Sequence, residues 1–280
     1  MQNLKKSAKS RGVIVFAFNT TINYVGIADL SSRLIAHNLK LPITLITDMD
    51  SDPKFKYDKV IRIAPEHTTN IRGAAGDTQI QWRNFGRYLA YELSPYYETI
   101  LIDTDYLVLD DSLLKLFDTE FDYKLMHNNQ TNTGPSTDVM GTTGLPFVWA
   151  TVVLFRKTER ADMLFNLVGR IQRNYNYYRM VYNISKGNFR NDFAFAIANN
   201  ILNGYTLNEA QGIPWPLFSI YHDIESITKS GCFLKINHAV IATGKWPLTT
   251  IVAQQNIHIL DKQYLETNNF KQLVEQLCES

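Results

Sequence analysis

Short apolar runs alternate with longer amphipathic segments in the first part of the chain. The apolar runs lie near residues 13–18, 43–47, 59–63 and 99–103, and the segments with helical spacing lie near 24–39 and 79–93. Short apolar runs are typical of buried strands, whereas apolar positions three and four residues apart are typical of helices. The alternation predicts βαβ units, and therefore an α/β fold with a mixed, mostly parallel sheet and helices on both of its faces.

The second part of the chain begins with a polar, glycine-rich stretch at 127–147, where we expect a long loop that orders over a ligand. A strand is predicted at Phe147–Arg156 and a helix at Ala161–Asn174. With 280 residues, of which 45% are hydrophobic, the chain can bury a large core. We therefore expect one domain over 1–280, with halves at 1–126 and 127–280.

Two aspartates follow the apolar run that crosses residues 96–102. Asp103 and Asp105 are separated by one residue, so in an extended segment their side chains point the same way, with Cα atoms about 6–7 Å apart. Two carboxylates in one small volume repel each other, and a hard divalent cation removes this conflict. The pair predicts a site for Mg²⁺ or Mn²⁺. The structural alternative is an ordinary turn, since Asp is common where strands end.

Composition excludes several other classes of protein. The longest apolar stretches are strand-sized, far below the roughly 20 residues that cross a bilayer, and Met1–Arg11 has no apolar signal segment. We expect a soluble, cytoplasmic protein without a membrane span. Cys232 and Cys278 are the two cysteines, and they form no CxxC motif, so neither a disulfide framework nor a zinc site is predicted.

Basic residues concentrate in one segment, although the net charge of the chain is only +1. Residues 156–190 contain eight basic and two acidic side chains, and arginines there alternate with Tyr, Phe and Asn. Cations bind phosphates and aromatic faces stack on exposed bases, so this composition suits a nucleic-acid surface. The residues expected to contact such an acceptor are Arg173, Tyr177, Arg179 and Arg190. The structural alternative is a solvated helix whose tyrosines pack on the core.

The surroundings of the aspartate pair resemble a known family. An aromatic-rich helical segment, then Leu93-Ser94-Pro95-Tyr96, an apolar strand and Asp-x-Asp are similar to the nucleotide-sugar glycosyltransferases of the GT-A fold. The glycogenin-like branch and the glycosyltransferases of tailed bacteriophages resemble this order most, and the likeness extends over most of the chain. It implies a Rossmann-like GT-A fold, a UDP-sugar or other nucleoside diphosphate sugar as donor, and Mn²⁺ or Mg²⁺ as cofactor. A phage-encoded enzyme would work in the host cytoplasm.

The resemblance also implies roles for individual residues. Residues 1–126 would hold the nucleotide, and residues 127–280 the donor sugar and the acceptor. The nucleotide would contact Ala17, Asn19, Tyr24, Asp48, Arg83, Asp103 and Lys262. Asn19, Asp48 and the aspartate pair also follow predicted parallel strands, whose carboxyl ends form ligand crevices. Asp192, at the start of an apolar helix, would contact the sugar or the acceptor hydroxyl, although it could simply cap that helix.

The third protein ligand of the metal has two candidates. The family pattern H-x-x-G-x-x-K-P-W is matched loosely by His238 with Gly244 and Lys245, where the spacing is longer and Trp precedes Pro. His258, followed by Lys262, is the second candidate. Either histidine could coordinate the metal through a neutral imidazole, and Lys245 or Lys262 could neutralise the diphosphate during catalysis.

Three functions remain open at this point. The basic aromatic segment and the phage-like resemblance together favour a 5-hydroxymethylated pyrimidine in phage DNA as the acceptor of the sugar. The second possibility is a glycosyltransferase that acts on a glycan, lipid or protein hydroxyl. The third is a non-catalytic nucleic-acid-binding module on the same fold. The sequence does not fix the donor sugar, the choice between inversion and retention, or the oligomeric state.

Overall fold

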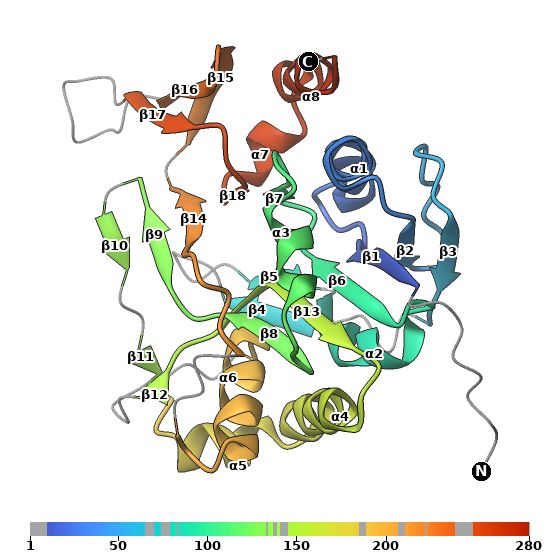
Figure 1. Cartoon of the computed structure of the whole chain (residues 1–280), viewed down its shortest axis with the longest axis vertical. Coiled ribbons are helices and arrows are strands. Elements are labelled where there is room, and N and C mark those ends of the chain that lie inside the picture. Colours follow the sequence, from blue (N-terminus) through green and yellow to red (C-terminus); the bar gives the residue numbers. More distant parts are fainter. Residues whose placement is uncertain are drawn as a thin grey trace.

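A six-stranded sheet lies at the centre of the protein, in the strand order β3-β2-β1-β6-β13-β8 (Figure 1). The computed structural model describes residues 10–64, 70–73, 79–82, 84–132, 134–136, 139–140, 145–184, 189–206, 211–221, 223–238 and 249–279. The strands of this sheet are β1 (Arg11–Phe16), β2 (Ile43–Thr47), β3 (Lys59–Arg62), β6 (Glu98–Ile102), β8 (Tyr123–Met126) and β13 (Trp149–Arg156).

The pairing in this sheet is mixed and mostly parallel. β1 pairs in parallel with β2 and β6, and β2 in parallel with β3, whereas β13 pairs antiparallel with β6 and β8. β13 belongs to the second half of the chain and lies beside β6, the strand that leads into the aspartate pair. The predicted α/β fold with a mixed, mostly parallel sheet is confirmed.

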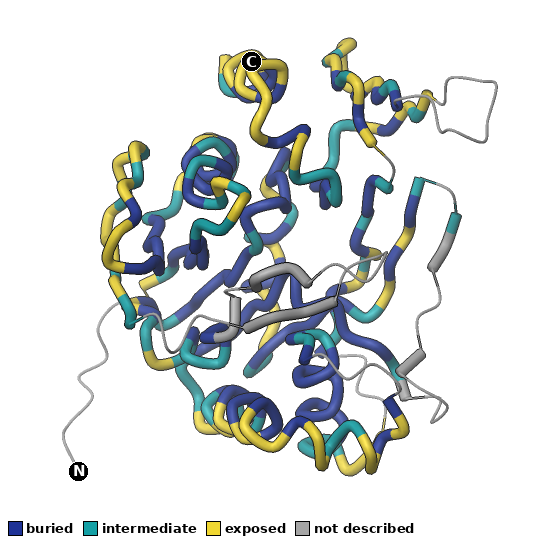
Figure 2. Tube along the Cα trace, turned by 180° about the vertical axis from the view of Figure 1, so that it is seen from behind, coloured by how far each residue is buried: buried dark blue, intermediate teal, exposed yellow. Residues whose placement is uncertain are grey.

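Helices cover both faces of the sheet. α1 (Tyr24–Leu39) lies on one side, and α2 (Ala90–Leu93), α4 (Glu159–Arg173) and α6 (Asn191–Leu202) lie on the other (Figure 1). Every residue of β2, β6 and β13 is buried, as expected for strands that are covered on both faces. Figure 2 shows the same arrangement, with buried strands at the centre and exposed positions on the outer sides of the helices.

A second sheet of five short strands begins directly after the aspartate pair. Its order is β10-β9-β14-β18-β7, with β7 (Tyr106–Leu107), β9 (Asn129–Thr131), β10 (Gly134–Ser136), β14 (Leu217–Ile220) and β18 (Ile257–Ile259). α7 (Lys262–Leu265) and α8 (Asn268–Cys278) follow β18. Apolar residues of α8, including Phe270 and Val274, pack with Ile27 and Leu34 of α1 and so join the C-terminal segment to the first part of the chain.

The remaining elements are short or peripheral. They are β4 (Asn70–Gly73), β5 (Gln79–Trp82), the 3₁₀ helices η2 (Asn84–Leu89) and η3 (Leu116–Asp118), α3 (Ser112–Lys115), β11 (Val139–Met140), β12 (Leu145–Pro146), α5 (Tyr175–Val181), β15 (Ile224–Ser230), β16 (Phe233–His238) and β17 (Thr249–Ala253). β15, β16 and β17 form an antiparallel sheet of their own. Within the described ranges, no helix is both long enough and apolar enough to span a membrane.

Two predicted elements differ from the structure. The helix expected over 79–93 begins only at Asn84, because residues 79–82 form β5 and pair with β4; polar and apolar side chains alternate there, as in a strand. The loop expected at 127–147 contains β9, β10, β11 and β12. β9 is stabilised by pairing with β14, far away in the sequence, so no local pattern reveals it.

Candidate active site

The two aspartates lie where the two sheets meet. β6 ends at Ile102 and β7 begins at Tyr106, so Asp103 and Asp105 occupy the carboxyl end of a central parallel strand. The backbone N–H of Asp103 donates to the carbonyl of Thr151 on β13, which fixes the start of this connection. Asp105 is buried and Asp103 is partly exposed. The carboxyl ends of parallel strands are where ligands bind in sheets of this kind.

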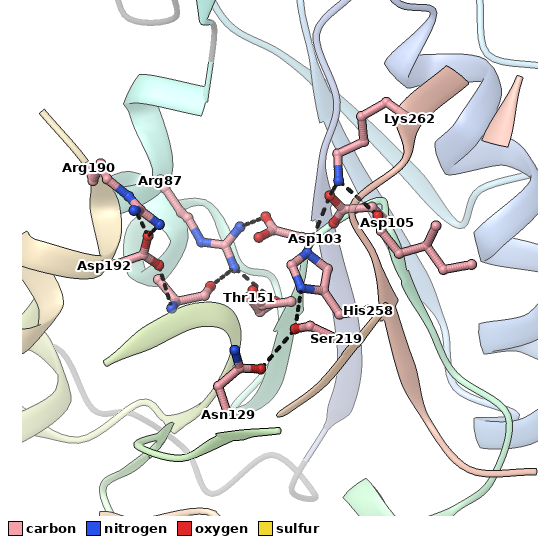
Figure 3. Close-up of polar contacts among 12 residues, drawn as sticks. Arg87, Asp103, Asp105, Asn129, Thr151, Arg190, Asp192, Ser219, His258 and Lys262 are labelled. Atoms are coloured by element: carbon pink, nitrogen blue, oxygen red, sulfur yellow. Dashed lines mark hydrogen bonds and ion pairs between the residues drawn. The ribbon is translucent and has the colours of Figure 1, made fainter. Parts of the chain in front are cut away.

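Asp105 meets a histidine and a lysine from the C-terminal part of the chain. Oδ2 of Asp105 lies 3.5 Å from Nε2 of His258 on β18 and also contacts Nζ of Lys262, the first residue of α7 (Figure 3). Burial alone would raise the pKa of Asp105, but the charges of Lys262 and His258 outweigh it and hold that pKa far below its usual range. Asp105 is therefore ionised throughout the physiological pH range.

The second carboxylate oxygen of Asp105 differs from the first in its surroundings. Oδ1 is buried and has no hydrogen-bond partner among the residues that the structure describes. A buried carboxylate oxygen without a donor is costly. Its lone pairs are available to a cation.

Asp103 is held by an arginine from the 3₁₀ helix η2. Nη1 of Arg87 contacts Oδ1 of Asp103, and Nη2 donates to the carbonyl oxygens of Ala150 and Thr151, the latter at 3.3 Å. The pKa of Asp103 is raised to about 6, because burial and the neighbouring charge of Asp105 together outweigh the opposing effect of Arg87. The two aspartates thus titrate far apart, as expected for carboxylates that share one site.

The imidazole of His258 is oriented by two buried polar side chains. Its Nδ1 lies 3.1 Å from Oγ of Ser219 on β14, and that hydroxyl donates to Oδ1 of Asn129 on β9 at 2.9 Å. Ser219 has one proton, which goes to Asn129, so the Nδ1–H of His258 is the donor in the other bond. Nε2 faces Asp105 (Figure 3): when it is protonated it donates toward that carboxylate, and when the imidazole is neutral its lone pair lies on Nε2.

Asp192 lies on the side of Arg87 that is opposite to Asp103 (Figure 3). It is the second residue of α6, so it does not cap that helix from outside. Its Oδ1 accepts the backbone N–H of Ala150 at 2.9 Å, and its Oδ2 accepts from Nη2 of Arg190 at 2.6 Å. Asp192 and Arg87 therefore both bond to the backbone of Ala150, which links the acidic residue of α6 to the aspartate pair.

The residues expected at the nucleotide follow the neighbouring strands. Ala17 and Asn19 come after β1, and Asp48 comes after β2. Oδ1 of Asn19 accepts the N–H of Val25, and Oδ1 of Asp48 accepts the N–H of Ser51, both at 2.9 Å. These bonds order the two loops, and Tyr24 begins α1 beside them. Since β1 lies next to β6, all of them share one edge of the sheet with Asp103.

The two candidate histidines differ in their positions. His258 lies beside Asp105, whereas Nε2 of His238, on β16, lies 3.0 Å from Oγ1 of Thr250. The structure thus brings His258 to the aspartates and places His238 in the separate antiparallel sheet. Lys245 and Arg83 lie outside the described residues. Arg87, four residues after Arg83, contacts Asp103.

The four expected acceptor residues divide into two groups. Arg190 is bound to Asp192 and belongs to the site. Arg173, Tyr177 and Arg179 lie on the outer surface formed by the end of α4 and by α5, where Tyr177 is 62% exposed. The Arg173 guanidinium lies 5.8 Å from the ring centre of Tyr88, and Nε of Arg179 donates to Asn176 at 3.3 Å.

Sequence reasoning missed Arg87, Ser219 and Asn129. Arg87 carried a usable signal, because residues four apart share one face of a helix and Arg83 was already a candidate. Ser219 and Asn129 carried none, since they reach His258 only through pairing between strands that are distant in sequence.

A preformed metal cage is not present in the described part of the chain: no three His, Cys, Asp or Glu side chains there are close enough to hold an ion together. The ion pairs with Arg87 and Lys262 draw the two carboxylates in different directions. The donor types nevertheless fit a divalent cation, because Asp105 has a buried oxygen without a hydrogen-bond partner among the described residues and Nε2 of His258 faces the same carboxylate.

Comparison with known proteins gave matches in structure only. No protein-family model matches the chain, and no curated protein sequence matches it. The apo-form glycosyltransferase GlyE of Streptococcus pneumoniae TIGR4 is 14% identical with a TM-score of 0.37; the match covers 71% of this chain but only 46% of GlyE. An active-site mutant of LgtC is 14% identical with a TM-score of 0.45, over 68% of this chain and 70% of LgtC. Mouse xyloside xylosyltransferase 1 is 11% identical with a TM-score of 0.42, over 76% of this chain and 85% of the mouse protein.

All of these identities are low, and all three TM-scores lie below 0.5. The function that we propose therefore rests on the geometry of the site and on the resemblance of the sequence motifs.

Proposed function

We propose that the protein is a metal-dependent glycosyltransferase, which moves a sugar from a nucleoside diphosphate sugar to an acceptor hydroxyl. The observation that carries this proposal is the contact of Asp105 with His258 and Lys262 at the carboxyl end of β6, two residues after Asp103. Two carboxylates and an imidazole suit a divalent cation, and a lysine beside them suits a phosphate. This combination is expected where a diphosphate is both bound and released.

Asp103, Asp105 and His258 would hold Mn²⁺ or Mg²⁺. When bound, the ion would offset the negative charge that develops on the diphosphate as the glycosidic bond breaks. Asp105 is ionised throughout the physiological pH range, and Asp103 becomes ionised above about pH 6. Lys262 neutralises Asp105 in the metal-free protein, and its ammonium group would be free to meet the diphosphate once a cation takes its place.

The other residues of the site would position the reactants. Arg87 fixes Asp103 and the Ala150 carbonyl, and Asp192, held by Ala150 and Arg190, would orient a hydroxyl of the sugar or of the acceptor. The loops after β1 and β2, with Ala17, Asn19, Tyr24 and Asp48, would contact base and ribose. Lys245 and Arg83 stay in the proposal on the sequence resemblance alone.

The acceptor that we propose is a 5-hydroxymethylated pyrimidine in DNA. Its support is the exposed surface of α4 and α5, where Arg173 and Arg179 supply charge for phosphates and Tyr177 supplies an aromatic face for stacking. A base in a duplex would have to leave the stack to reach the aspartate pair. Phage origin rests on the sequence resemblance. A glycan, lipid or protein hydroxyl is the other possible acceptor.

One experiment tests both levels of the proposal. The protein is incubated with Mn²⁺ and a panel of nucleoside diphosphate sugars, with and without a hydroxymethylated oligonucleotide, and nucleotide release and product mass are measured. We expect Mn²⁺-dependent release of nucleoside diphosphate that is lost in Asp103→Asn, and a mass increase of one sugar on the oligonucleotide. Nucleotide release with no change in the mass of the oligonucleotide would favour a glycan, lipid or protein acceptor. If no donor gave nucleotide release, the result would favour the non-catalytic, nucleic-acid-binding function.

A further inference from the structure

A small cavity lies on the other face of the five-stranded sheet from the His258 contacts. Its volume is about 200 Å³, and Gln130 and Phe218 contribute to its lining. Gln130 follows Asn129 on β9, and Phe218 precedes Ser219 on β14, and these two residues are partners across the strands. Because successive side chains of a strand point to opposite faces, the cavity is separated from the proposed metal site by the sheet itself.

One wall of the cavity is apolar and partly accessible. It consists of Trp215, Pro216 and Phe218, of which Trp215 and Phe218 are half-buried and Pro216 is exposed. The side chains of Trp and Phe offer flat apolar faces, and Trp adds an N–H donor at its edge. The indole N–H of Trp215 is not bonded to another described residue. This wall can take a ligand with one apolar face and polar edges.

The rest of the lining includes polar side chains that are fixed in place. Oδ1 of Asp110 accepts from the N–H of Ser112 at 2.9 Å and from Nδ2 of Asn256 at 2.8 Å. Asn256 in turn accepts the N–H of Leu109 at 2.6 Å. These bonds hold the Asp110 carboxylate rigidly and leave its Oδ2 without a hydrogen-bond partner in the described ranges. A preorganised carboxylate oxygen is a strong acceptor for a hydroxyl group.

Two further side chains supply both hydrogen-bond donors and acceptors. Gln130 and Gln255 line the cavity, and neither amide is bonded to another residue that the structure describes. Each amide offers a carbonyl acceptor and two N–H donors. The described lining contains no Lys, Arg or His, so nothing there favours a phosphate or another anion. The ligand that suits this lining is neutral, rich in hydroxyl groups and apolar on one face.

We infer that this cavity binds one neutral pyranose unit of a saccharide. The apolar C–H face of the sugar lies on Trp215 and Phe218, and its hydroxyl groups bond to Asp110, Gln130 and Gln255. The volume agrees with a single ring, since it corresponds to roughly seven water molecules and lies below the several hundred Å³ typical of larger ligands. This inference does not depend on the proposed sugar transfer, because the cavity lies behind the sheet and needs no metal.

The test measures binding of methyl glycosides of glucose, galactose and mannose by saturation-transfer NMR, with the full chain in EDTA. We expect at least one glycoside to bind with a dissociation constant on the order of 1 mM, the range usual for a small polar ligand at one subsite. Trp215→Ala should weaken this binding at least tenfold. Gln130→Leu, at an exposed position that cannot disturb the core, should weaken it severalfold.

Two controls accompany these variants. Phe233→Ala removes an aromatic side chain that is exposed on a different sheet, and it should leave glycoside affinity unchanged. Methyl phosphate, whose methyl protons would report binding, should give no signal. The inference is overturned if none of the three glycosides binds, or if both Trp215→Ala and Gln130→Leu bind as tightly as the unaltered protein.

Discussion

Nε2 of His258 lies 3.5 Å from Oδ2 of Asp105, and the same carboxylate oxygen contacts Nζ of Lys262. An ammonium group and an imidazole thus meet one buried carboxylate. A divalent cation would use the carboxylate and the imidazole but would be repelled by the ammonium group. Lys262 and a divalent cation would therefore compete for Asp105. In the metal-free protein, Lys262 occupies the place that the cation and its diphosphate would share.

Lys262→Met tests this competition. We expect Mn²⁺ to bind severalfold more tightly to the variant, because the competing positive charge is gone. Sugar transfer should fall about 10- to 100-fold, because the diphosphate loses a charged donor. Mn²⁺ affinity is measured by titration calorimetry, and transfer by nucleotide release. Lys271→Met, at an exposed position of α8, is the matched control and should change neither quantity. Weaker Mn²⁺ binding in Lys262→Met would contradict the competition.

Asp105→Asn should weaken Mn²⁺ binding by about 100-fold or more, since the amide keeps the shape of the side chain but removes its charge and one oxygen ligand. Titration calorimetry with Mn²⁺ gives the affinity directly, and circular dichroism verifies the fold. Asp52→Asn is the matched control, because Asp52 is an exposed aspartate whose ion pair with Lys54 lies at the surface. Unchanged Mn²⁺ affinity in Asp105→Asn would rule out the aspartate pair as the metal site.

The raised pKa of Asp103 predicts how metal binding depends on pH. Burial raises this pKa from 3.8 to about 6 in the folded protein. A raised pKa means that Asp103 favours folding below about pH 4, and that this contribution is lost as the pH rises through about 6. Mn²⁺ requires the ionised form, so its affinity should fall up to tenfold per pH unit below about pH 6.

The measurement is the increase in melting temperature on adding Mn²⁺, at several pH values between about 4.5 and 7.5. We expect an increase of several degrees above about pH 6 and little below about pH 5. The comparison with and without Mn²⁺ at each pH cancels the effects of titrating groups that do not bind the ion. An increase of the same size at all pH values would show that Asp103 does not bind the ion.

The sequence was sufficient to predict the elements that depend on local patterns along the chain. β1, β2, β6 and the helix α4 follow from local apolar patterns, and parallel pairing follows from their alternation. The position of Asp103 and Asp105 at the end of a buried strand was likewise predictable, because both the strand and the acidic pair are local features. These elements fix the α/β class and one half of the site.

The rest of the site depends on contacts between distant segments. His258 and His238 were both candidates, His238 through a loose match to the family pattern and His258 as a strand residue followed by Lys262. Only the pairing of β18 with β7 brings His258 to Asp105. Ser219 and Asn129 lie beside His258 through the parallel pairing of β14 with β18 and with β9. No spacing rule connects such strands, since their register is set by the core on both sides.

The α4–α5 surface predicts a salt-dependent affinity for DNA. The double variant Arg173→Glu, Arg179→Glu should bind hydroxymethylated DNA at least tenfold more weakly, because two phosphate contacts become repulsive. The slope of log affinity against log salt should also fall by about two. Fluorescence anisotropy at several salt concentrations measures both. Lys229→Glu with Lys235→Glu, on the separate β15–β16 hairpin, is the matched control. Unchanged DNA affinity and transfer in the α4–α5 variant would remove the support for a DNA acceptor.

Ser219→Ala should weaken Mn²⁺ binding without unfolding the protein. Ser219 is buried and holds Nδ1 of His258, so its hydroxyl keeps Nε2 directed at Asp105. Without it the imidazole can rotate or adopt the other tautomer, and we expect Mn²⁺ affinity to fall about 10- to 100-fold. The ¹⁵N chemical shifts of His258 report the tautomer independently of activity. Ser230→Ala, at the exposed end of β15, is the matched control. A changed Mn²⁺ affinity with an unchanged tautomer would show that Ser219 acts through packing instead.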